Sequence, residues 1–286
     1  MHIGLLNKLW RHDMKMIRSI KRVFLAICLS IIAAGIVQAQ SWEEYDPQVG
    51  QVGKDVIWVP TPNSLVDTML DMAKVTPEDY MVDLGSGDGR IVIAAAKRGA
   101  RAHGIEYNPD MVELSRRNAA KEGVSDKATF AEADLFESDF SKATVITMFL
   151  LQDLNIQLRP KILSLNPGTR IVSNSFDMRE WVADEVATVN EDCCGFCTAY
   201  LWIVPANVAG TWKLEKGELT LDQSFQMIKG TLISGDVSMP VIGRLNGDQI
   251  SFNVDSRDYI GRVSGNSMSG TVEGGISRWS AIRIPE

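Results

Sequence analysis

Residues 83–90, DLGSGDGR, combine three glycines with acidic side chains, a composition suited to holding a small ligand against the backbone. An apolar run at residues 80–82 precedes them and an alanine-rich helical run follows. The order of strand, glycine loop and helix lets backbone amides approach a ligand closely. Asp83 and Asp88 would repel a pyrophosphate, and Arg90 stands where the dinucleotide fingerprint has its third glycine. The loop therefore favours a ligand with a cationic end over a nicotinamide dinucleotide.

An acidic residue also ends the next expected strand. Glu106 is placed where a carboxylate accepts hydrogen bonds from both hydroxyls of a ribose. Tyr107 can stack on adenine, and Asp134, after the third strand, can accept the adenine amino group, with Phe136 beside the ring. The combination predicts a site for S-adenosylmethionine. The residues expected to bind it are Asp83, Gly85, Ser86, Gly87, Glu106, Tyr107 and Asp134.

Side chains for the acceptor are expected at the ends of the fourth and fifth strands. Phe149 would face the methyl group, and residues 173–176 would line an acceptor channel. Phe149, Asn174 and Trp181 are the candidates for this catalytic side of the site. The Asn/Asp-Pro-Pro-aromatic motif is absent after the fourth strand, which counts against methylation of nucleobases and amides.

The elements around these residues alternate between strand and helix. Apolar runs predict strands at residues 80–84, 100–105, 128–131, 144–149 and 170–174, and helices at 90–97, 109–122 and 152–165. This alternation predicts a Rossmann-like α/β fold, a parallel sheet with helices on both faces. Residues 185–189 and 198–204 follow without a helix between them and are expected to form a closing antiparallel pair.

The pattern changes after Pro205. Short alternating runs separated by glycines predict a small all-β meander, either a barrel or a sandwich. The expected strands are residues 211–214, 218–221, 226–228, 249–254, 259–263 and 278–284. We expect a methyltransferase domain at residues 57–205, a C-terminal β domain at 206–286 and a polar lead-in at 40–56.

Residues 1–39 have the pattern of an export signal. A basic segment precedes an apolar stretch at residues 23–37, and small residues at 37 and 39 predict cleavage after Ala39. The alternative is an uncleaved signal-anchor. Either way, we expect the remainder to be exported across the inner membrane, into the periplasm or held at its surface.

Charge and cysteines limit the possible chemistry. The net charge is −7, and an acidic chain without a basic cluster argues against a nucleic-acid partner. Cys194 and Cys197 could form a local disulfide in an oxidising compartment, act as a redox pair, or remain free or metal-bound. Because His103 is the single histidine after residue 39, no metal site is expected.

Together, these residues resemble the family of membrane-associated protein-lysine methyltransferases, whose mitochondrial members act on the adenine nucleotide translocase and the ATP synthase c subunit. The resemblance covers roughly residues 56–205 and is carried by the segments 59–62, 83–90, 104–109, 134–135 and 168–174. It implies S-adenosylmethionine as cofactor and a protein with an accessible lysine, membrane-associated in these relatives, as partner. It also implies that Thr61 lies over the cofactor and that Leu135 accompanies Asp134.

Two alternatives remain open at this stage. One is a small-molecule methyltransferase with the same cofactor site. The other is an exported binding protein that keeps the fold without catalysis, because S-adenosylmethionine is a cytoplasmic metabolite and an exported enzyme needs a supply of it. The set of Asp83, Glu106 and Asp134 favours an enzyme.

Overall fold

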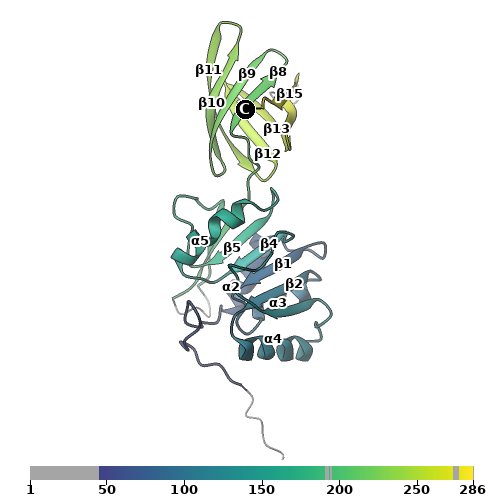
Figure 1. Cartoon of the computed structure of the whole chain (residues 1–286), viewed down its shortest axis with the longest axis vertical. Coiled ribbons are helices and arrows are strands. Elements are labelled where there is room, and N and C mark those ends of the chain that lie inside the picture. Colours follow the sequence, from purple (N-terminus) through teal and green to yellow (C-terminus); the bar gives the residue numbers. More distant parts are fainter. Residues whose placement is uncertain (1–44, 191–192, 194, 273–276, 286) are drawn as a thin grey trace, which may run out of the picture. The chain divides into compact units, whose positions relative to one another are not determined.

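The computed structural model describes residues 45–190, 193, 195–272 and 277–285 (Figure 1). The expected export signal at residues 1–39 lies outside these described residues. Among the helices that are described, none is long and apolar enough to cross a membrane.

A seven-stranded sheet with helices on both faces occupies the first part of the described chain, which confirms the α/β prediction. The strand order is β3-β2-β1-β4-β5-β7-β6, in which β1 to β5 run parallel and β7 pairs antiparallel with both β5 and β6. The strands are β1 Tyr80–Leu84, β2 Arg101–Glu106, β3 Ala128–Glu132, β4 Val145–Met148, β5 Arg170–Asn174, β6 Glu185–Thr188 and β7 Thr198–Ile203. The helices are α2 Asn63–Met72, α3 Arg90–Lys97, α4 Pro109–Lys121 and α5 Gln152–Leu163.

Alternate residues of the strands supply the two cores of this sheet. Met81 packs with buried residues of α2, α3 and α4, whereas Val82 packs on the other side with buried residues of α5. All four residues of β4 are buried, as expected for a central parallel strand covered on both faces.

The strand order places a crevice at one edge of the sheet. The chain proceeds outward from β1 through β2 to β3, then returns to β4 on the other side of β1. In open parallel sheets, ligands bind beyond the carboxyl ends of the strands at this point of reversal. Asp83 and the glycine loop follow the carboxyl end of β1, so the fold brings the predicted residues to this crevice.

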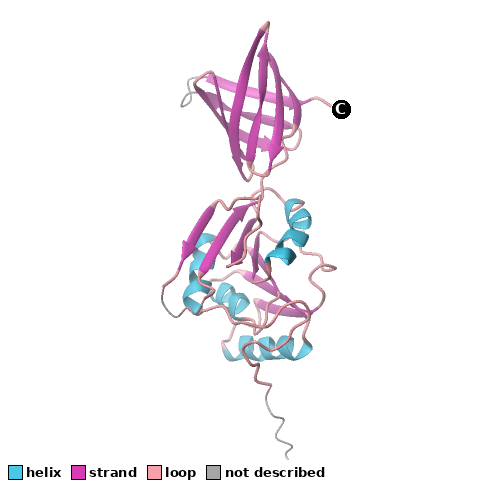
Figure 2. Cartoon of the chain, turned by 90° about the vertical axis from the view of Figure 1, so that its left-hand side faces the viewer, coloured by secondary structure: helices cyan, strands magenta, loops and turns pink. Residues whose placement is uncertain are grey.

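The second part of the described chain forms a closed antiparallel barrel, so the expected barrel or sandwich is a barrel (Figure 2). Its strands are β8 Gly210–Leu214, β9 Gly217–Ser224, β10 Met227–Ser234, β11 Val237–Asn246, β12 Gln249–Val254, β13 Arg257–Ser264, β14 Ser267–Val272 and β15 Ser277–Arg283. Trp212 and Trp279 are buried in its core, and β15 pairs with β8 to close it. The strands β11 and β14 were not anticipated.

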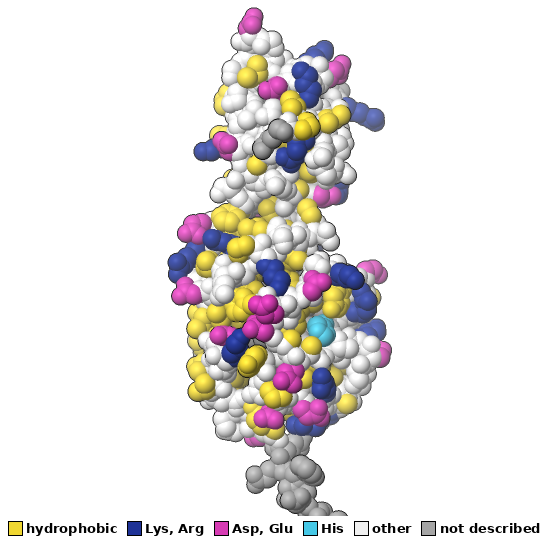
Figure 3. Space-filling view, viewed as in Figure 1, with side chains coloured by type: hydrophobic (Ala, Val, Ile, Leu, Met, Phe, Trp, Pro, Cys, Tyr) yellow, Lys and Arg dark blue, Asp and Glu magenta, His cyan; other side chains and the backbone are white. Residues whose placement is uncertain are grey.

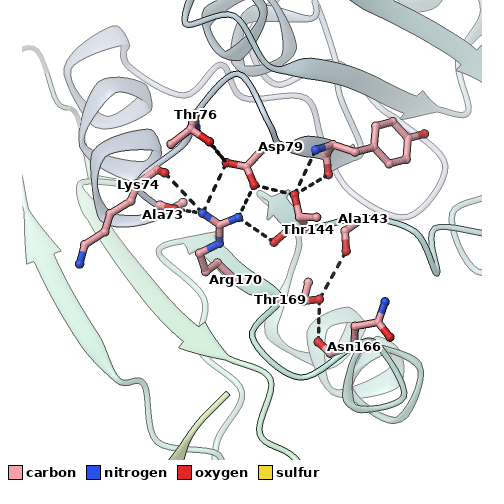
Figure 4. Close-up of polar contacts among 10 residues, drawn as sticks. Ala73, Lys74, Thr76, Asp79, Ala143, Thr144, Asn166, Thr169 and Arg170 are labelled. Carbon is pink, nitrogen blue, oxygen red and sulfur yellow. Dashed lines mark hydrogen bonds and ion pairs between the residues drawn. The ribbon is translucent and has the colours of Figure 1, made fainter. Parts of the chain in front are cut away.

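An ion pair fixes the amino ends of the central strands, opposite the crevice (Figure 4). The Arg170 guanidinium pairs with the Asp79 carboxylate and donates to the carbonyl of Ala73 at 2.8 Å. Asp79 also accepts from the Thr144 hydroxyl at 2.7 Å. Burial alone would raise the pKa of Asp79, but hydrogen bonds from Arg170, Thr144 and the Thr76 amide hold it below its usual value.

We expect Arg170→Ala to lower the free energy of unfolding by about 3 kcal/mol, because it leaves the buried Asp79 charge without its partner. The measurement is urea denaturation. Arg179→Ala is the control, because Arg179 pairs with Asp153 where the two side chains are 52% and 88% exposed, and its loss should cost less than about 1 kcal/mol. Equal losses for both variants would contradict a special role for Arg170.

Candidate functional site

A cavity of about 560 Å³ lies at the crevice beyond the carboxyl ends of β1, β2 and β4. Its walls come from the glycine loop, from the segments after β2, β3 and β4, and from residues 51–61. Nine residues that the sequence predicted for the cofactor line this cavity: Thr61, Asp83, Gly85, Ser86, Gly87, Glu106, Tyr107, Asp134 and Leu135. Phe136, which was expected beside the adenine ring, does not line it and packs against the core of the sheet. A volume of this size is typical of small-molecule and cofactor sites.

Gly85 and Gly87 shape the loop between β1 and α3. Both adopt positive φ angles, +79° and +53°, which side-chain-bearing residues rarely adopt. At Gly87, a Cβ atom would also lie 2.8 Å from Nε1 of Trp58, so a side chain here would strain the backbone and displace Trp58. The loop therefore keeps its backbone exposed to the cavity.

Glu106 holds the glycine loop against the end of β2. One carboxylate oxygen accepts from the Gly87 amide at 2.9 Å, and the other accepts from the Asn108 amide at 3.0 Å. Each oxygen has a further lone pair, and the side chain lines the cavity. The carboxylate is thus fixed in place and can still accept hydrogen bonds from a pair of ligand hydroxyls.

Asp83 is a buried carboxyl group at the base of the cavity. Its Oδ1 accepts from the Thr147 hydroxyl at 2.7 Å. Burial raises the pKa of Asp83 to about 7, and the nearby Glu106 and Asp88 carboxylates act in the same direction, whereas the Thr147 hydrogen bond opposes them. An uncompensated buried acid of this kind suits a cationic ligand group, because a positive charge would return the pKa to its ordinary range.

The two side chains predicted to contact adenine are already engaged by Lys54. Its Nζ lies 2.5 Å from Oδ2 of Asp134 and 4.8 Å from the centre of the Tyr107 ring. The hydrogen bond between the two side chains raises the pKa of Lys54 and lowers that of Asp134. An adenine amino group that bound Asp134 would compete with this ammonium group.

We expect Lys54→Met to tighten the binding of S-adenosylmethionine about threefold to tenfold, because adenine no longer has to displace the Lys54 ammonium group from Asp134. Calorimetric titration measures the change. Lys97→Met is the matched control, since Lys97 pairs with Glu122 at an exposed position away from the cavity. Weaker binding in Lys54→Met would instead make Lys54 part of the occupied site.

The described part of the expected lead-in at residues 40–56 is largely exposed, but residues 51–56 also form part of the cavity wall. Val52 and Ile57 form an antiparallel bridge, and the Trp58 amide donates to the Gln51 carbonyl at 2.9 Å. The segment lines the cavity, so Lys54 and Trp58 are contact residues that sequence reasoning missed. Polar composition without periodicity gave no signal for them.

The turn that contains Thr61 is tied to both walls of the cavity. Its carbonyl accepts from Arg90 Nη1 at 2.9 Å, and Arg90 in turn pairs with Asp88 of the glycine loop. The Thr61 hydroxyl accepts from Asn174 Nδ2 at 3.2 Å. The turn is therefore fixed beside the cavity, and the position of Thr61 over the cofactor stays a prediction.

The three acceptor-side candidates lie in different surroundings, and only one of them lines the cavity. Phe149 lines the cavity. Asn174 is fully buried and acts through its hydrogen bond to Thr61. Trp181 is fully buried away from the cavity lining, where it stacks on Phe225 at 5.7 Å between ring centres. Its wide aromatic surface suited the core better than an acceptor channel.

The cysteine pairing also differs from the sequence prediction. Cys193 and Cys197 form the disulfide, with their Cα atoms 5.7 Å apart, between β6 and β7. Cys194, which the sequence offered as one possible partner of Cys197, lies outside the described residues. Spacing alone could not distinguish the two neighbouring cysteines.

Comparison with known proteins identifies the family. Residues 83–185 match the profile of the ANTKMT methyltransferase domain. A protein-lysine N-methyltransferase of Saccharolobus islandicus is 43% identical over 152 residues, which cover 52% of this chain and 94% of the relative. The chain belongs to the same methyltransferase family as this relative. The adenine nucleotide translocase lysine N-methyltransferase of Mus musculus is 37% identical over 128 residues, which span 44% of this chain and 55% of that relative.

A solved relative supports the same assignment. The structure of an RNA methyltransferase from Salinibacter ruber, in complex with S-adenosyl-L-homocysteine, is 46% identical, with a TM-score of 0.50 over 52% of this chain and 96% of that one. The cavity fits an adenosine cofactor, because a carboxylate with free lone pairs, a buried acid and an aromatic side chain line it together. The chain is an S-adenosylmethionine-dependent methyltransferase.

Proposed function

We propose that the chain transfers methyl groups from S-adenosylmethionine to the side-chain amine of a lysine in a protein. The observation that carries this is the cavity, in which Asp83 and Glu106 lie at the carboxyl ends of β1 and β2, here called its polar end, and Phe149 follows β4, here called its apolar end. The 43% identical relative that bears the name protein-lysine N-methyltransferase supports the choice of acceptor. Small-molecule transfer and a non-catalytic role have no comparable support.

The polar end of the cavity would bind and orient the cofactor. Glu106 would accept from both ribose hydroxyls, Asp83 would pair with the ammonium of the amino-acid tail, and Asp134 would accept from adenine after releasing Lys54. S-adenosylmethionine supplies a methyl group that is already activated by its bond to a positive sulfur. The protein therefore mainly has to align this group with the acceptor and exclude water.

The apolar end would prepare the acceptor. Phe149, Leu150 and Leu151 line the cavity after β4. Their apolar surface disfavours a charged ammonium, so a lysine entering here would lose its proton to solvent more readily. The nitrogen lone pair would then form a bond to the methyl carbon as the carbon–sulfur bond breaks, with that bond's electron pair remaining on sulfur.

The alternative acceptor class is RNA, because the Salinibacter ruber relative is named an RNA methyltransferase. The charge of this chain disfavours it, because phosphate binding needs clustered lysines and arginines and the chain carries a net charge of −7. On the face shown in Figure 3, Lys and Arg side chains lie interspersed with Asp and Glu. A protein acceptor fits this surface better.

We also propose that the protein is exported or held at the membrane by its N-terminal segment. The basic and apolar pattern of residues 1–39 supports this, as does the disulfide between Cys193 and Cys197, since disulfides persist in oxidising compartments. Cell fractionation with determination of the mature N-terminus is the test. A soluble cytoplasmic chain that begins at Met1 would contradict it.

The deciding experiment for the acceptor follows tritiated methyl groups. The purified chain and tritiated S-adenosylmethionine are incubated with an extract of the organism that encodes it, and protein and RNA are then separated. We expect label in protein, recovered as methyl-lysine after acid hydrolysis, and none with Glu106→Ala. Label in RNA alone would overturn the proposed acceptor.

A further inference from the structure

Three phenylalanine rings meet at the apolar end of the cavity, and all three line it. They come from different segments: Phe149 follows β4, Phe176 follows β5 and Phe196 precedes β7. Ring centres lie 6.2 Å apart for Phe149 and Phe176, 5.2 Å for Phe149 and Phe196, and 6.1 Å for Phe176 and Phe196. The three rings therefore form one continuous aromatic wall.

The disulfide holds the third of these rings, that of Phe196. Cys197 is the residue after Phe196, and its bond to Cys193 closes a short loop. The Cys197 carbonyl also accepts from the Val189 amide at 2.9 Å, and the hydroxyls of Thr188 and Thr198 lie 3.1 Å apart. Phe196 is thus attached to the base of the β6–β7 hairpin, which limits the positions its ring can take.

The position of this wall relates it to the acceptor and not to the cofactor. The acids that suit the cofactor lie at β1, β2 and β3, whereas the rings gather beyond β4 and β5. Aromatic faces attract a methylammonium group, the charged product that methyl transfer leaves on a lysine, and their edges pack well along an alkyl chain. A methylated lysine side chain has both features.

We propose that Phe196, held by the Cys193–Cys197 disulfide, is a specificity-determining residue that forms the outer wall of the entrance for the acceptor lysine. This inference rests on the proposed function. It concerns a part of the chain beyond the matched family domain, which ends at residue 185. The disulfide would thereby control how well the acceptor is held without touching the cofactor.

The test measures acceptor-side and cofactor-side binding separately in the full chain. The probe is Nα-acetyl-Nε-trimethyl-lysine amide, followed by ligand-observed NMR on protein saturated with S-adenosylhomocysteine. The neutral analogue with carbon in place of nitrogen is the control ligand. The variants are Phe196→Ala, Phe196→Leu, Phe196→Tyr and the double variant Cys193→Ser/Cys197→Ser.

We expect the cationic probe to bind more tightly than its neutral analogue, and Phe196→Ala to weaken it about threefold to tenfold. Phe196→Leu should lose the preference for the cation, Phe196→Tyr should retain it, and the double cysteine variant should weaken the probe in the same direction. Affinity for S-adenosylhomocysteine should stay at the unmodified value throughout.

Three results would overturn the inference. They are no binding of the probe to the cofactor-loaded protein, unchanged probe affinity in Phe196→Ala, and an equal loss of cofactor affinity in that variant. Failure of the unmodified chain to bind S-adenosylhomocysteine is a different result, because it would remove the proposed function itself.

Discussion

Glu106→Ala should lower the affinity for S-adenosylmethionine at least about 100-fold, because it removes the cavity-lining carboxylate that we propose accepts two hydrogen bonds from the ribose. The same change frees the Gly87 and Asn108 amides, which the carboxylate now holds at 2.9 and 3.0 Å. The glycine loop would then lose its attachment to the end of β2. Both effects weaken binding.

Calorimetric titration with S-adenosylmethionine and with S-adenosylhomocysteine tests this prediction. Both ligands carry the ribose, so both should lose affinity to a similar extent, whereas a purely electrostatic effect on the sulfonium would spare the second. Glu132→Ala is the matched control: Glu132 pairs with Glu106 in the register between β2 and β3 but is exposed and does not line the cavity. Binding of Glu106→Ala close to that of the control would contradict the assignment of the ribose site.

The residues on the cofactor side of the site could be predicted from the sequence because their positions follow from short, local patterns in the chain. Glycines in the loop and acids at strand ends sit at fixed offsets from apolar strands, so strand order alone brings Asp83, Glu106 and Asp134 together. Parallel strands such as β1 and β5 were also placed at their observed bounds, since buried apolar runs mark them.

The remaining residues depend on contacts between distant parts of the chain. Lys54 reaches Asp134 from a polar segment 80 residues earlier, and no periodicity marks it. In the barrel, β11 contains Pro240, and β14 is rich in serine and glycine, so neither reads as a strand from local propensity. Pairing with neighbours on both sides in the closed barrel outweighs these weak preferences.

Affinity for S-adenosylmethionine should rise about tenfold or more between pH 5.5 and pH 7.5, because the pKa of Asp83 is about 7 and we propose that its ionised form pairs with the cofactor ammonium. The cofactor amine begins to lose its proton near the top of this range, which would reduce the rise by about twofold at most. Titration calorimetry at several pH values gives the dependence. Asp83→Asn should bind weakly with a flat profile, and an unchanged slope in that variant would assign the dependence to another group.

The same carboxyl group should oppose folding when no cofactor is bound. A carboxylic acid whose pKa is raised in the folded state binds more protons there than in the unfolded chain, so stability falls as pH rises. Here the loss should begin near the unfolded pKa of about 4 and be complete above about 7, with a total on the order of 4 kcal/mol.

Asp83→Asn should remove this penalty, since an amide oxygen can still accept from the Thr147 hydroxyl and carries no charge. The variant should therefore be more stable than the unmodified protein at pH 8 and equally stable near pH 4, as measured by denaturation of the cofactor-free form. Because the buried charge that costs stability is the one that would attract the cofactor, gain of stability and loss of affinity should appear together. A variant that lost affinity without gaining stability at pH 8 would show that Asp83 is already ionised and compensated in the empty site.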